Sequence, residues 1–143
     1  MPAPGRNVEV VSLLFVEFWQ HECCGDLFGV GDVVAWPVVP VEGDGLVSLL
    51  GADLGRQLPL TVDRHGDDHE TLTGTVLSIR AVFHQLEPVT GQADGVSHRA
   101  RPGSAQLRYV NRTQRRERLG DLEWAGYMVE LSVSTRSQPD GPA

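Results

Sequence analysis

The sequence predicts an all-β fold, a small and partly open barrel with one or two short helices. Two apolar runs, Val8–Trp19 and Phe28–Trp36, are rich in the β-branched and aromatic residues that favour strands. Two later segments, Gly74–His84 and Trp124–Val133, alternate apolar and polar side chains as half-buried strands do. Strands of irregular spacing with little helix between them indicate a barrel or a strongly bent sheet.

The composition is that of a single soluble domain. The chain has 143 residues, of which 41% are hydrophobic, enough for one core. We expect the barrel domain to span residues 8–133, with a disordered lead-in at 1–7 and a disordered tail at 134–143. No run approaches the ~18 apolar residues of a membrane span. The first apolar run contains Glu9 and Glu17, unlike a signal peptide. We therefore expect a cytoplasmic protein without a membrane partner.

The remaining elements follow from spacing and turn residues. Leucines at helical spacing predict a short helix within residues 43–57, and residues 58–62 and 107–110 read as short strands. Asn111–Gly120 has a capping pattern that predicts a second helix. The Gly- and Pro-rich stretch 88–104 predicts a mobile surface loop. Alternation predicts two sets of inward side chains: Leu77, Ile79, Ala81 and Phe83, and then Tyr127, Val129, Leu131 and Val133.

The two cysteines, Cys23 and Cys24, are adjacent and have no other cysteine to pair with. Neighbouring cysteines rarely form a disulfide because of their geometry, so we expect a reducing compartment. Thiolate and imidazole are ligands that zinc prefers, and His21 together with His65 or His69 could complete a four-ligand site. Two alternatives stay open. The thiols could simply pack in the core, or one could be a reactive thiol activated by a histidine.

A polar loop, Asp63–Glu70, gathers two histidines and four acids in eight residues. Oxygen- and nitrogen-rich loops of this kind can hold a divalent cation, and they can equally be solvated hairpin loops. Trp19 and Trp36 flank the cysteine-bearing stretch. They would serve either as core aromatics or as a binding platform at the barrel rim.

The charge is unevenly distributed along the chain. The net charge is −7, but segment 99–118 carries seven arginines against one acid, Glu117, so it is +6 and the remainder is −13. Arg112, Arg115 and Arg116 would share one face of the predicted helix. This segment could bind phosphate or an acidic protein surface, and some of its arginines could instead pair with the acidic remainder of the same domain. A nucleic acid is not the expected partner, because nucleic-acid-binding proteins usually carry a basic footprint overall. The sequence gives no oligomeric state.

Two resemblances add to these patterns. Phe28-x-Val30-Gly31-Asp32-x-Val34 and Gly74-x-Val76-x-x-Ile79 resemble strands of SH3-like barrels of the KOW or Tudor type, which implies a small barrel. The whole chain resembles a family of short bacterial proteins of unknown function. The shared positions are Trp19, Gln20, Cys23, Cys24 and Gly25, the F-x-V-G-D turn, Asp63, His65 and Gly66, and the closing run Gly126–Leu131. That family implies no activity.

The sequence therefore predicts a small cytoplasmic binding or adaptor module. The alternative is a metal-assisted or thiol-dependent enzyme that uses His21, Cys23, Cys24 and His65, with zinc as the metal. A serine–histidine–acid pattern, a phosphate-binding glycine loop and a dinucleotide fingerprint are all absent from the sequence, which favours the binding module.

Overall fold

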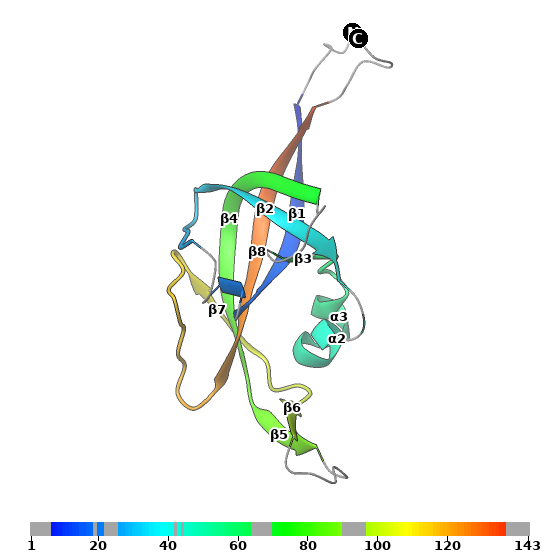
Figure 1. Cartoon of the computed structure of the whole chain (residues 1–143), viewed down its shortest axis with the longest axis vertical. Helices are drawn as coiled ribbons and strands as arrows, with labels where there is room; N and C mark the ends of the chain where they lie inside the picture. The colour runs from blue at the N-terminus through cyan, green and yellow to red at the C-terminus, as the bar shows by residue number, and fades with distance from the viewer. Residues whose placement is uncertain are drawn as a thin grey trace.

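The computed structural model describes residues 7–18, 20–21, 26–41, 43, 45–63, 70–89 and 97–136. Figure 1 shows long strands that cross at one centre, two short helices to one side of them and a small two-stranded ribbon at one end. The elements are β1 (Asn7–Glu17), β2 (Val33–Pro40), α2 (Gly45–Leu50), α3 (Ala52–Gly55), β3 (Leu60–Val62), β4 (Glu70–His84), β5 (Leu86–Val89), β6 (Ser97–Ala100), β7 (Gln106–Val110) and β8 (Glu123–Arg136).

Five of these strands form a closed barrel. Their order is β2, β3, β1, β8 and β4, and pairing of β2 with β4 completes the ring. β1 runs parallel to β3, and the other pairs in the ring are antiparallel. Closure leaves these strands without an unpaired edge in the ring. The predicted all-β barrel with short helices is confirmed, and pairing of β2 with β4 makes it closed where the prediction had it partly open.

Strand β4 is long enough to pair with two different strands along one edge. Its first half pairs with β2, for example Gly74 with Val34, and its second half pairs with β7, for example Arg80 with Tyr109. β8 covers the other edge of β4. The two segments that resemble SH3-like strands are neighbours: the first leads into β2 and the second lies on β4, and the Val76 N–H donates to the Asp32 carbonyl at 2.9 Å.

A β-bulge interrupts β4 close to the point where its partner changes. The register with β8 shifts between Val76 and Ser78, so Leu77 falls outside the alternation and is 44% exposed. The prediction that Leu77 points inward is wrong for this reason. The same prediction for Ile79, Ala81 and Phe83 is confirmed, because all three are buried.

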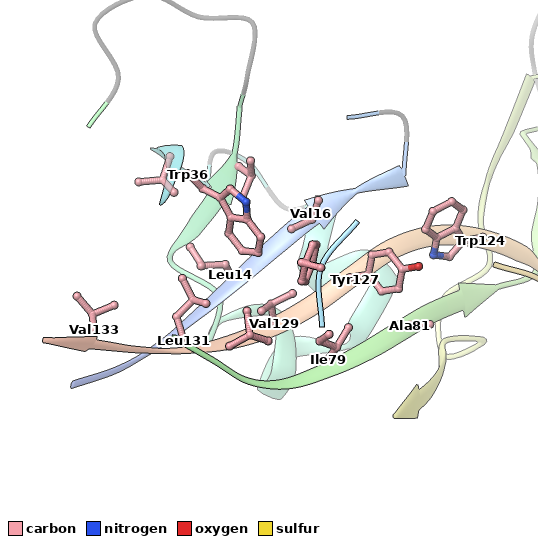
Figure 2. Close-up of a cluster of buried hydrophobic side chains, with 14 of the residues drawn as sticks. Leu14, Val16, Trp36, Ile79, Ala81, Trp124, Tyr127, Val129, Leu131 and Val133 are labelled. Carbon is pink, nitrogen blue, oxygen red and sulfur yellow. The ribbon is translucent and has the colours of Figure 1, made fainter. Parts of the chain in front are cut away.

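The core has two parts, one inside the barrel and one outside it. Figure 2 shows side chains of β1, β4 and β8 converging in the barrel, with Trp36 of β2 facing them. The second cluster lies on the outer side of the same sheet, where Phe15, Val82 and Met128 pack with Leu49 of α2. Strands β4 and β8 therefore bury adjacent side chains on opposite faces, with Val82 next to Phe83 and Met128 next to Val129.

The predicted helix at 111–120 is wrong, since the structure has turns and irregular chain there. Thr113 is buried and exchanges hydrogen bonds with the backbone of Phe28: its N–H donates to the Phe28 carbonyl at 2.8 Å, and its Oγ1 accepts from the Phe28 N–H at 3.0 Å. The Val30 N–H donates to the Asn111 carbonyl at 2.8 Å. Pairing with a distant segment has overridden the local capping pattern.

The described parts of the stretch 88–104, predicted as a loop, include strand: the end of β5 pairs with β6 in an antiparallel ribbon. At the base of this ribbon, the Arg101 N–H donates to the Gln85 carbonyl at 2.7 Å, which joins the residue after β6 to the residue before β5. Residues 90–96 lie outside the described part of the chain. None of the helices that the structure describes is long and apolar enough to span a bilayer.

Candidate functional site

A hollow of about 670 Å³ lies between α2 and the ends of β1 and β2. Its apolar wall includes Phe15, Leu46 and Leu49, and its polar wall comprises Glu17, Gln20, Asp63 and His84. Gln20 is almost fully buried, and its Nε2 donates to Oδ1 of Asp63 at 3.3 Å. A volume of this size with a few convergent polar groups is typical of small-molecule or peptide sites.

A second hollow of about 610 Å³ adjoins the first, because Phe18 and His84 line both. Its wall is more charged and includes Arg116, Arg118 and Asp121. Phe18 is 42% exposed and its ring lies 6.3 Å from that of Trp124. The first hollow is mainly apolar beside α2, and the second is charged beside the 111–122 segment.

The only candidate zinc ligand within the described residues, His21, is completely buried in an aromatic box. The rings of Phe28, Trp124 and Tyr127 meet it edge-on, with centroids 5.9, 6.1 and 5.2 Å away. Its Nε2 lies 2.8 Å from the Gln114 carbonyl, which can only accept, so Nε2 carries the proton. A metal would therefore have to bind through Nδ1.

Tyr127, also fully buried, ties the 111–122 segment to the barrel wall. Its hydroxyl donates to Oε2 of Glu117 at 2.6 Å and accepts from the N–H of Gln114 at 3.1 Å. Burial and the hydrogen bond to Glu117 together raise the pKa of the Tyr127 phenol far above its ordinary value. The single carboxylate of segment 99–118 is thus bound to the barrel.

All seven arginines of that segment are exposed. We call them the arginine surface: Arg99, Arg101, Arg108, Arg112, Arg115, Arg116 and Arg118. Nε of Arg99 pairs with Oε1 of Glu87 at 2.8 Å, and Nη1 of Arg101 donates to Oε1 of Gln85 at 3.2 Å. The segment 99–118 carries a net charge of +6 on an otherwise acidic protein.

The other predicted site residues fall into two groups. Trp36 is 4% exposed with its ring 4.9 Å from that of Phe28, so it belongs to the core rather than to an exposed platform. Trp19, Cys23, Cys24, His65 and His69 lie outside the described residues. Within the described ranges, no three acidic, histidine or cysteine side chains come together as a metal site would require.

Sequence reasoning missed Phe18, His84 and Tyr109. Phe18 looked like the end of a buried strand, but the chain leaves β1 at Glu17 and exposes its ring. Tyr109 is 70% exposed on a strand that read only as short and apolar. The sequence offered one indication, the tyrosine next to an arginine on this strand. That pair indicates a binding surface only if the strand lies at the edge of the sheet, which the sequence does not show.

The structure is that of a small closed β-barrel protein with an exposed arginine-rich segment at residues 99–118. The chain belongs to the Family of unknown function (DUF6578), whose model matches residues 11–133. A search of curated proteins and a search of solved structures each found no match.

Proposed function

We propose that this protein is a cytoplasmic binding module that docks an acidic surface of a partner protein on its arginine surface. The observation that carries the proposal is that all seven arginines are exposed while the one acid among them, Glu117, is bound to buried Tyr127. The barrel therefore carries these guanidinium groups on its exterior, where a partner can reach them.

Physical chemistry indicates the kind of partner. Arginine presents a planar fork of donors that matches carboxylates in a bidentate way. The rest of the chain carries −13, which repels polyanions at long range and favours a compact acidic patch as the ligand. Exposed charges separated by more than about 8 Å are screened at physiological salt, so such an interface should be salt-sensitive.

The test is fluorescence anisotropy with a labelled peptide of ten glutamates. Replacing Arg112, Arg115 and Arg116 together with alanine should weaken binding at least about tenfold, and raising the salt concentration should weaken binding to the unmodified protein. Arg56→Glu is the control, because Arg56 is exposed outside the surface. Equal affinity of the triple variant would overturn the proposal, as would tighter binding of a single-stranded DNA of matched charge.

The alternative function, a metal-assisted or thiol-dependent enzyme, is favoured by a different observation. The hydrogen bond between Gln20 and Asp63 joins two segments at the rim of the larger hollow. Cys23 and Cys24 follow Gln20 by three and four residues, and His65 follows Asp63 by two. A chain spans at most about 3.6 Å per residue. The two segments that carry the candidate ligands begin at Gln20 and Asp63, which both line this hollow.

Elemental analysis of protein purified without chelator tests this alternative. About one zinc per chain, lost when both cysteines are replaced with serine, would support the site formed by His21, Cys23, Cys24 and His65. Absence of metal together with thiols that resist alkylation until the protein is denatured would leave the cysteines as packing residues.

A further inference from the structure

Strand β7 is the terminal strand of the six-stranded sheet. It pairs with β4 along residues 106–110, and no second strand pairs with it in the part of the chain that the structure describes. In an antiparallel sheet every second residue of such a strand directs its N–H and C=O away from the neighbour. An edge of this kind is a template for another strand.

The exposed side chains of β7 are aromatic on one face and cationic on the other. Tyr109 is 70% exposed, and Arg108, the adjacent residue, is exposed as well. Successive residues of a strand point to opposite faces, so a strand added at this edge would meet Tyr109 on one face and Arg108 on the other.

The Tyr109 ring is supported from the neighbouring strand. Arg80 stands directly opposite Tyr109 in the β4–β7 register, and its guanidinium carbon lies 5.5 Å from the ring centroid. This cation–π contact restrains an aromatic ring that solvent otherwise surrounds, so an incoming strand has less side-chain entropy to remove. A restrained, exposed tyrosine is a typical anchor for a bound chain.

We infer that β7 accepts an extended acidic segment of the partner as an additional strand, with carboxylates toward Arg108 and an apolar or β-branched side chain over Tyr109. This inference rests on the proposed function and states how the acidic partner is held. Arg112, two residues beyond the end of β7, would extend the cationic face along the same segment.

Charge also disfavours the other strands that could pair with this edge, namely a basic strand or a second copy of β7. Charged side chains on an edge strand ordinarily discourage pairing, and a second copy of β7 would bring its own Arg108 to the same face. An acidic strand reverses the sign of that contact and gains cross-strand ion pairs instead. Arg108 therefore excludes basic and self pairing while it admits an oppositely charged strand.

The experiment uses a labelled nine-residue peptide that alternates glutamate and threonine, and the same peptide with N-methyl groups on alternate residues. N-methylation keeps the charge and removes backbone donors, so we expect at least about a tenfold loss of affinity. Arg108→Glu and Tyr109→Ala should each weaken binding of the unmodified peptide by at least about fivefold. Arg56→Glu should leave it unchanged, and thermal melts should show all three variants folded.

The outcomes separate the two proposals. If the N-methylated peptide binds as tightly as the unmodified one, strand addition is refuted, while the acidic-partner proposal stands on its own salt and arginine tests. If Arg108→Glu and Tyr109→Ala bind normally while the arginine triple variant does not, the edge is refuted in the same way. If no acidic peptide binds the unmodified protein, both proposals are overturned.

Discussion

Phe83→Ala should destabilise the protein strongly, while Leu77→Ala should hardly affect it. The two residues lie six positions apart on β4, and strict alternation would place both in the core. The bulge at Leu77 separates them, leaving Phe83 1% exposed and Leu77 44% exposed. The pair therefore tests whether the register of β4 against β8 is correct.

The expected magnitudes follow from these environments. Phe83 fills the barrel interior and is paired in register with Trp124, so its truncation leaves a cavity and should cost about 3–5 kcal/mol. Leu77→Ala removes a side chain that is largely hydrated, and the loss should stay below about 1 kcal/mol.

Urea denaturation followed by tryptophan fluorescence measures both values. With a slope of about 2 kcal/mol per molar, a loss of 4 kcal/mol lowers the midpoint by about 2 M, and a loss below 1 kcal/mol lowers it by less than about 0.5 M. Far-UV circular dichroism must first show that each variant is folded. Comparable losses for the two variants, or a larger loss for Leu77→Ala, would refute the bulge and the face assignment.

Four further predictions test other features of the protein. Gly126→Ala should prevent folding or lower the free energy of unfolding by several kcal/mol, because the φ of Gly126 is 146° and an added Cβ would collide with the β1 backbone. Gly103 has a φ of 76° but lies in open space, so Gly103→Ala should cost only about 1–2 kcal/mol. Urea melts measure both losses. Tyr127→Phe should lower the free energy of unfolding by about 1.5–3 kcal/mol, because it removes the 2.6 Å hydrogen bond to Glu117. A double-mutant cycle with Glu117→Gln should show that the two losses are coupled. Additive losses would mean that this hydrogen bond does not stabilise the protein measurably. The folded state raises the pKa of Tyr127 above its ordinary value of 10.0. The contribution of the neutral phenol to stability is therefore complete below about pH 10 and declines at higher pH. Melts at alkaline pH should show this decline for the unmodified protein and not for Tyr127→Phe. Alkylation of the native protein should modify the two cysteines at different rates, as read by mass spectrometry, and equal rates would contradict that prediction.

The sequence by itself determined the fold class and most strand positions. Its β-branched runs and alternating segments correctly indicated β1, β2, β4 and β8, and the leucine spacing correctly indicated α2. These signals are local, since they depend on which side chains repeat along one strand or one helix. The arginine-rich segment was equally visible, because charge can be counted without a structure.

Only the tertiary structure decided which residues face solvent and which segments meet. The bulge at Leu77 depends on the pairing of β4 with β8, and the irregular chain at 111–120 depends on hydrogen bonds to residues 28–30. Likewise, the open edge at Tyr109 arises from strand order, which no local pattern encodes. Long-range backbone hydrogen bonds and shared burial outweigh local propensities of a few tenths of a kcal/mol per residue, so the site could be read only from the folded chain.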